Sequence, residues 1–313
     1  MILPLIRFLG HGLGTFIFHF APIRKKIILQ QITKAYPEKT QHEVHTLARK
    51  NYQHYALLFW EVLFFRRKKD FEKYVEVSGY EHVENALRKG QGVLLVGSHM
   101  GNFEITLRAA FLKKLELYFV VKTIRVKVLK WIVDFFRKNK YLKLIQSEHT
   151  YTKILELLKK NQAIGFVIDQ HKEKRGIYVS FFNRLAATNS SIVSLAMASG
   201  ASIVLGQTYR TPKGSFRISF APFPLTRTQN QDFDLFYNTQ EITCKIEEWI
   251  RIHPEQWLWG HRRWKGTYEG NQKIKPTLPY SRAAYAEYLS KSLQTDLFPG
   301  DGSHPPKSLT FSF

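Results

Sequence analysis

His99 and Glu104 are the residues of this sequence whose types and spacing are best suited to acid–base chemistry. Histidine has an ordinary pKa of about 6.5, so it can accept a proton at neutral pH, and a nearby carboxylate stabilises the resulting imidazolium. No other histidine among the 313 residues has a carboxylate five positions later. The pair therefore predicts a general base, His99, assisted by Glu104.

The spacing of this pair restricts where the two side chains can lie. On a continuous helix, five residues rotate two side chains roughly 140° apart. The two can meet only if His99 lies on a loop and Glu104 lies in the first helical turn. Gly97 and Gly101 make such a bend sterically easy, and a helix N-terminus at this place offers backbone donors to a developing oxyanion.

Other catalytic chemistries have little support in the sequence. Ser98 lacks the flanking glycines of a nucleophile elbow, because Val96 and Met100 occupy those positions. No His-Glu-x-x-His spacing occurs, and the single cysteine, Cys244, excludes internal disulfides and cysteine-based zinc sites. The sequence therefore predicts neither a metal nor a cofactor.

The elements that must position this pair are short apolar strands alternating with helical patterns. The strands are expected at residues 92–96, 117–121, 163–168 and 201–205, and the helices at residues 102–114, 126–140, 151–160 and 188–199. This alternation predicts an α/β fold with a largely parallel sheet and flanking helices. In such a sheet the active crevice lies beyond the carboxyl ends of the strands, where His99 follows the first strand.

The remaining segments complete the expected domain. The turn at residues 211–214 leads into a strand at residues 216–220, expected as an antiparallel addition at one edge of the sheet. A last long helix fits residues 233–252 and stops before Pro254. Residues 270–313 lack periodicity and are expected to form a loosely structured C-terminal tail.

The N-terminus predicts contact with a membrane. Residues 1–22 are almost wholly apolar and about as long as a bilayer span, and residues 24–26 are all basic. Positive charges after an apolar helix keep the following chain in the cytoplasm, whether the helix spans the bilayer or lies in its interface. A second apolar run, residues 55–65, carries Glu61 and is too short to span, and it ends in the basic residues 66–69. A buried core helix is the alternative for residues 1–22. The second run is expected to form a core or interfacial helix that docks on anionic lipid through its basic end, and a solvated helix end is the alternative.

The charge balance of the chain points to acidic partners. With 47 Lys and Arg against 25 Asp and Glu, the formal net charge is +22. Nucleic acid, an anionic membrane or an acidic carrier all fit such a charge. A nucleic-acid-binding protein lacks support from any recognition motif in the sequence, so no nucleic-acid partner is expected.

Several segments together resemble one family. The stretch from His99 to Glu104 resembles the H-x4-D/E box of the glycerolipid and lipid A acyltransferase superfamily. Residues 166–170, 176–182, 187–189 and 253–265 are similar, in order and spacing, to segments of the late lipid A acyltransferases, which transfer lauroyl and myristoyl chains. The resemblance covers roughly residues 5–266, and the C-terminal signature from His253 to Lys265 is its most specific part.

This resemblance implies a function and an organisation. Residues 23–269 would form an acyltransferase domain with a glycerol-3-phosphate acyltransferase-like fold, behind a membrane-anchoring helix at residues 1–22. The donor would be an acyl thioester on acyl carrier protein or coenzyme A. The acceptor would be an anionic glycolipid, a lipid A precursor, at the cytoplasmic face of the inner membrane. His99 would take the proton of the acceptor hydroxyl, and Glu104 would hold its ring.

The resemblance also suggests residues that contact the substrate, each with a structural alternative. Asn102, Arg137, Asp169 and Arg175 match positions that the family tends to keep polar, and they are expected to bind substrate phosphate or shape the site. Asp169 could instead cap the end of a strand, and the two arginines could lie on a solvated face. An enzyme of the same fold acting on another lipid, such as a mannosylated phosphoinositide or an aminolipid, remains the alternative function.

Overall fold

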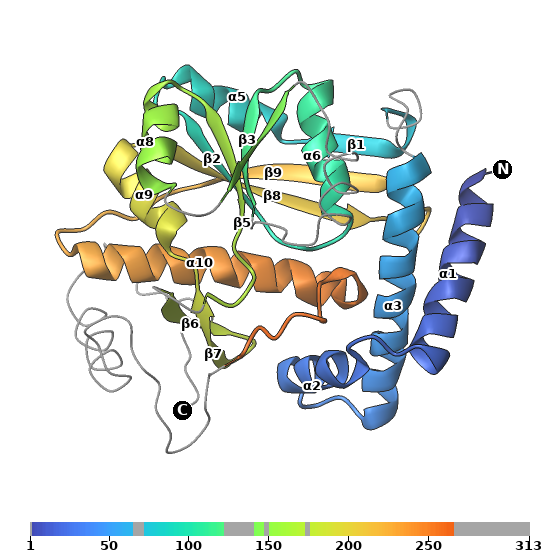
Figure 1. Ribbon diagram of the computed structural model, residues 1–313. Coiled ribbons are helices and arrows are strands. Elements are labelled where there is room, and N and C mark those ends of the chain that lie inside the picture. Colours follow the sequence, from blue (N-terminus) through green and yellow to red (C-terminus); the bar gives the residue numbers. More distant parts are fainter. Residues whose placement is uncertain (1, 65–71, 122–140, 147–149, 173–175, 266–313) are drawn as a thin grey trace, which may run out of the picture.

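A seven-stranded sheet forms the centre of the protein (Figure 1). The computed structural model describes residues 2–64, 72–121, 141–146, 150–172 and 176–265. The strand order is β1-β9-β8-β2-β5-β3-β4, with β1 (Val75–Ser78), β2 (Val93–Gly97), β3 (Leu117–Val121), β4 (Leu142–Gln146), β5 (Ala163–Val167), β8 (Ser202–Arg210) and β9 (Phe216–Phe223). The five strands from β8 to β4 are parallel, and β9 pairs antiparallel with β8.

Helices cover both faces of this sheet, and the sheet divides the core into two layers. On one face, α8 (Tyr151–Lys159), α9 (Ser191–Ser199) and α10 (Gln231–Ile252) bury residues such as Leu158, Leu195 and Ile246 against β2, β5 and β8. On the other face, α5 (Tyr80–Arg88) and α6 (Phe103–Leu112) pack on the same strands through Val83 and Leu107. Central strands that are buried on both faces explain the continuous apolar runs seen in the sequence.

Three helices at the N-terminus stand beside the sheet (Figure 1). They are α1 (Ile2–Phe20), α2 (Lys25–Ala35) and α3 (Gln41–Phe64), and α1 lies along α3. A Cβ at Gly14 would come within 2.4 Å of the Gln53 Cα, so glycine is needed for this close approach. Among the described helices, none combines the length and apolar character needed to cross a bilayer.

A small hairpin and the segment after α10 complete the described chain. Strands β6 (Ile177–Phe181) and β7 (Arg184–Thr188) form a separate antiparallel pair that packs on α10. The turn between them places Phe182 and Asn183 at positive φ. After α10, the short helix η1 (Pro254–Gln256) leads into a segment in which Trp257, Trp259 and Trp264 are all buried.

The expected α/β architecture is confirmed, with differences at its margins. The strand expected at residues 216–220 does pair antiparallel, but the edge position is wrong, because β1 pairs on its outer side. The helix expected from residue 188 begins at Ser191, because residues 184–188 belong to β7. The helix expected at residues 126–140 and the tail at residues 270–313 lie outside the described residues.

Candidate active site

The loop after β2 carries His99 at the carboxyl end of the central strand. The chain leaves β2 at Gly97 and enters α6 at Phe103. Gly101 makes the bend with a φ of +60°, and a Cβ there would lie 2.4 Å from the Thr208 carbonyl oxygen. His99 therefore lies on a loop, and Glu104 lies in the first turn of α6, as the spacing required.

Asp169 is the carboxylate that the structure places on the ring of His99. Its Oδ1 lies 2.8 Å from His99 Nδ1, and its Oδ2 accepts the backbone N–H of His99 at 2.8 Å. The Asp169 side chain is 1 % exposed and that of His99 is 17 % exposed. This contact forms because β2 and β5 are parallel neighbours, so the residues that follow them meet at one edge of the sheet.

The environment of Asp169 keeps it ionised. Burial by itself raises the pKa of this carboxyl, but the charge of His99 and the hydrogen bonds from His99 and Trp257 outweigh it, so the pKa lies below its ordinary value. Trp257 Nε1 donates to Asp169 Oδ2 at 2.7 Å, from a fully buried indole. An ionised Asp169 accepts the Nδ1 proton of His99, which leaves Nε2 as the basic nitrogen.

Gln170 agrees with this assignment of the His99 protons. Its Nε2 lies 3.3 Å from His99 Nε2 and 3.5 Å from Nδ1. Because Nδ1 donates to Asp169, Nε2 is the ring nitrogen left to accept from this amide N–H. The ring of Phe103 meets the His99 ring edge-on, with the centroids 5.3 Å apart, and further restricts its orientation.

The C-terminal segment fixes the loop from a second side. Met100 forms an isolated antiparallel bridge with Trp257, and the Gly101 N–H donates to the Gln256 carbonyl at 3.0 Å. Trp257 is buried, and its indole N–H also holds Asp169. Sequence reasoning missed this second role, since an indole N–H gives no signal of its partner.

His261 joins the same segment to the residues after Asp169. Its Nε2 accepts the backbone N–H of His171 at 2.9 Å, which requires an unprotonated nitrogen. Burial lowers the pKa of His261 to about 4. The ring is therefore neutral in the folded protein at pH 7.

Acid is expected to destabilise the protein through His261. The pKa of His261 is about 4 in the folded protein and about 6.5 in the unfolded chain. The contribution of neutral His261 to the unfolding free energy is therefore complete above pH 6.5 and is lost as the pH falls toward 4. His261→Gln keeps an acceptor for the His171 N–H but does not titrate. We expect a smaller loss of unfolding free energy between pH 7 and pH 5 in this variant, measured by urea denaturation. An unchanged loss would show that His261 does not titrate in this window.

The other residues expected at the site have different positions. Asn102 is fully buried under the loop, where its Nδ2 donates to Glu61 Oε2 at 3.1 Å. Glu104 is half-buried at the start of α6. Arg137 and Arg175 lie outside the described residues. Within the described part of the chain, no three His, Cys, Asp or Glu side chains gather as metal ligands would.

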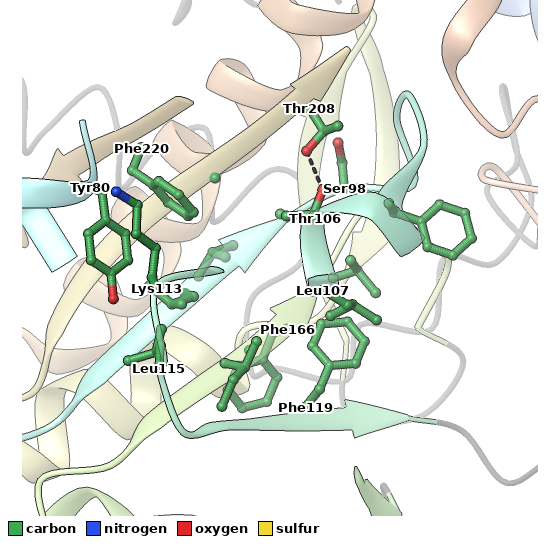
Figure 2. Close-up of a pocket in the computed structure, with 18 residues that line it drawn as sticks. Tyr80, Ser98, Thr106, Leu107, Lys113, Leu115, Phe119, Phe166, Thr208 and Phe220 are labelled. Carbon is green, nitrogen blue, oxygen red and sulfur yellow. Dashed lines mark hydrogen bonds between the residues drawn. The ribbon is translucent and has the colours of Figure 1, made fainter. Parts of the chain in front are cut away.

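An apolar pocket begins beside the His99 loop and runs between α6 and the sheet (Figure 2). It contains about 700 Å³ of space, part of it open to solvent. Ser98 and the hydrogen-bonded hydroxyls of Thr106 and Thr208 line the end near His99, while Tyr80 and Phe220 line the far end. Aromatic and aliphatic side chains from β3, β5 and α6 form the walls, which suits an alkyl chain.

The fold and this site define a class of protein. An imidazole held by a buried carboxylate, beyond the ends of parallel strands, can remove a proton from a hydroxyl. The apolar pocket next to it can hold the hydrocarbon part of a substrate. Together these features describe an enzyme that activates a hydroxyl beside a lipid-like chain.

Comparison with known proteins identifies the family. The family model of the bacterial lipid A biosynthesis acyltransferases matches residues 2–266, and the chain belongs to this family. It is 25 % identical over 272 residues to the lipid A biosynthesis lauroyltransferase of Escherichia coli K12, covering 85 % of this chain and 87 % of the relative. It is 22 % identical over 280 residues to the palmitoleoyltransferase of the same organism, covering 87 % and 88 %. The protein is thus an acyltransferase of lipid A biosynthesis.

Proposed function

We propose that this acyltransferase moves a fatty acyl chain from a thioester, carried by acyl carrier protein, to a hydroxyl of a lipid A precursor. The observation that carries this proposal is the His99–Asp169 pair on a loop whose residues Ser98 and Phe103 line an apolar pocket. Ser98 lines the pocket and His99 follows it in the chain. An acyl chain in the pocket would therefore present its thioester carbonyl near the imidazole.

The proposed reaction needs no covalent enzyme intermediate. His99 Nε2 takes the proton of the acceptor hydroxyl while that oxygen attacks the thioester carbonyl, and the new C–O bond forms a tetrahedral intermediate. When the C–S bond breaks, the imidazolium returns the proton to the leaving sulfur, so an ester and a free thiol result. General base catalysis of this kind is typically worth about 10²–10⁴-fold.

Two carboxylates would stabilise the imidazolium that forms. Asp169 acts directly through its contact with Nδ1. Glu104, in the first turn of the helix that follows His99, supplies a second negative charge in this proposal. Arg137 and Arg175 are proposed to bind the phosphate groups of the acceptor.

The most informative cellular experiment is lipid mass spectrometry of cells that lack this gene. The proposal predicts loss of one acyl chain from lipid A and restoration by a plasmid copy of the gene. A His99→Ala copy should not restore it. Lipid A of unchanged composition in the deletion strain, with another membrane lipid altered, would show that the acceptor is a different lipid.

The pocket is expected to limit the length of the acyl chain. A Cβ at Gly206 would lie 3.3 Å from the Phe220 ring, and both residues line the pocket. Gly206→Val should exclude about two methylenes, each worth about 0.8 kcal/mol, and lower kcat/KM for the longest accepted donor about tenfold relative to shorter donors. Gly206→Ala should have a smaller effect in the same direction. An unchanged chain preference in a folded, active Gly206→Val variant would remove the pocket from the proposal.

We further propose that α1 lies on the cytoplasmic face of the inner membrane. Its Gly10 and Gly14 face α3, and its outer side exposes apolar residues to solvent. These are Leu5, Phe8, Leu9, Leu13, Phe16 and Phe20, followed by Ile23. An apolar helix face next to basic residues 24–26 suits the interface of an anionic bilayer.

Removing the aromatic side chains of this face should weaken membrane binding. Phe8, Phe16 and Phe20 are 75 %, 56 % and 76 % exposed, so their replacement by serine should leave the fold intact. We expect at least a tenfold lower partition coefficient onto phosphatidylglycerol vesicles, measured by sedimentation. As a control, Leu144→Ser with Tyr151→Ser removes two exposed apolar groups elsewhere. Equal binding by the triple variant and the control would contradict the placement of α1.

A further inference from the structure

Glu61 lies within the apolar run of α3, and its buried carboxylate has no role in the proposed mechanism. It is 2 % exposed and forms a bidentate ion pair with Arg210 at the end of β8. Arg210 Nε lies 2.5 Å from Glu61 Oε1, and Nη2 lies 2.6 Å from Oε2. A buried ion pair of this kind is weak support for stability, because desolvation opposes the Coulombic attraction. The presence of the Glu61–Arg210 ion pair in the core therefore needs an explanation other than stability.

Arg210 also fixes the protons of a buried histidine. Its Nη1 lies 2.7 Å from His54 Nδ1, and His54 is 2 % exposed. A guanidinium only donates, so Nδ1 is the acceptor and His54 carries its proton on Nε2. That Nε2 lies 3.2 Å from the Gly101 carbonyl and donates to it. Burial and the nearby Arg210 charge lower the pKa of His54 well below its ordinary value, so the ring stays neutral.

This network ends on two consecutive residues of the loop that carries His99. Glu61 accepts from the Asn102 amide, and His54 donates to the Gly101 carbonyl. Gln256 connects Arg210 to the opposite side of the loop, because its side chain bonds the Arg210 backbone N–H and carbonyl. The Gln256 carbonyl in turn accepts the Gly101 N–H. Helix α3, strand β8 and the segment after α10 are thus joined at this one bend.

We propose that Glu61, Arg210 and His54 are positioning residues that hold the bend at Gly101 and Asn102, and through it the ring of His99 against Asp169. The bend lies two and three residues after His99, so a shift there moves the ring away from Asp169. A displacement of about 1 Å at a catalytic group can cost about 10²-fold in rate. This inference rests on the proposed function of His99 as the base.

The test separates positioning from simple destabilisation. Glu61→Gln keeps the shape of the side chain but removes the charge opposite Arg210. We expect kcat to fall at least tenfold per folded molecule, with KM for donor and acceptor changed less than twofold. The matched control is Asp234→Asn, which neutralises another buried carboxylate that accepts hydrogen bonds from Thr228. It should lower the melting temperature while kcat stays at the wild-type value.

A second variant covers the case in which Glu61→Gln does not fold. His54→Leu removes the bond to Gly101 and leaves the partners of the Glu61–Arg210 pair in place, and the same selective fall in kcat is expected. A second readout is the ¹⁵N NMR spectrum of the His99 imidazole, in which either variant should alter the Nδ1–H signal of the contact with Asp169. Wild-type kcat and an unchanged His99 signal in the variant that folds would overturn the positioning role.

The proposed function fails in a different way. If wild-type protein transfers acyl chains and His99→Ala does not, the proposed function stands whatever Glu61→Gln does. If wild-type protein transfers no acyl chain, the proposed function fails, and the His99 imidazole signal alone then decides whether the network positions the loop.

Discussion

His99→Ala is expected to lower kcat at least 100-fold, because it removes the nitrogen that takes the proton of the acceptor hydroxyl. The fold should survive, since His99 lies on a loop and its side chain is 17 % exposed to solvent. Asp169 would lose one hydrogen bond but keep those from Trp257 and from the backbone of residue 99. We therefore expect a loss of about 1–3 kcal/mol in unfolding free energy.

Acyl transfer and thermal unfolding should be measured on the same preparation of this variant. The matched control is His82→Ala on α5, which removes a half-buried histidine outside the pocket and should keep wild-type kcat. If His99 is only a structural residue, its loss would lower the melting temperature while activity per folded molecule survives. Near-normal activity for His99→Ala would end the proposed mechanism.

Asp169→Asn is expected to lower kcat by about 10²–10⁴-fold, the full contribution of the base. The substitution keeps the shape of the side chain but removes the charge that stabilises the imidazolium. An amide NH₂ facing Nδ1 would also favour the tautomer that carries its proton on Nε2. In that tautomer Nε2 has no free lone pair and cannot take the proton of the acceptor hydroxyl. The effect should appear in kcat with only a small change in donor KM.

Glu104→Gln distinguishes the two carboxylates. The structure shows Asp169 on His99 Nδ1, so Asp169→Asn should shift the pKa of His99, followed by ¹H NMR, further downward than Glu104→Gln does. Trp257→Phe should give a milder loss of activity, since it removes one hydrogen bond to Asp169 and keeps an aromatic ring in the core. If Glu104→Gln shifts this pKa further than Asp169→Asn, Glu104 rather than Asp169 is the main partner of the imidazolium.

The sequence predicts the central strands well because they are buried on both faces. Strands β2, β3, β5 and β8 appear as continuous apolar runs, and the site lies after the first of them. The short outer strand β1 alternates between buried and exposed residues and gives no such run. Its pairing outside β9 depends on contacts far apart in the chain, so the edge of the sheet was placed wrongly.

The partner of His99 shows what a local motif omits. The spacing from His99 points to Glu104, whereas the structure places Asp169 on its ring, 70 positions further along the chain. This contact depends on β2 and β5 being neighbours, and the strand order is not visible in a motif. A signal was present, since Asp169 follows a predicted strand end where parallel strands gather polar groups.

Glu61 illustrates the same point for a buried charge. In the sequence it interrupts an apolar run, and the only inference drawn from it there is that this run does not span a membrane. In the structure it pairs with Arg210 and holds Asn102, both distant in sequence. A lone charge in an otherwise apolar helix thus indicates a partner, but the sequence does not say which residue supplies it.

The most direct test of the account is acyl transfer by the purified protein. Wild-type protein in phosphatidylglycerol-containing micelles is incubated with acyl-loaded acyl carrier protein and a lipid A precursor, and the glycolipid is analysed by mass spectrometry. The account predicts that the glycolipid gains the mass of one acyl group in place of a hydroxyl hydrogen, while the carrier is released as the free thiol. The Asp169→Asn and His99→Ala variants should give almost none of this product. Equal product from wild-type protein and His99→Ala would contradict the account.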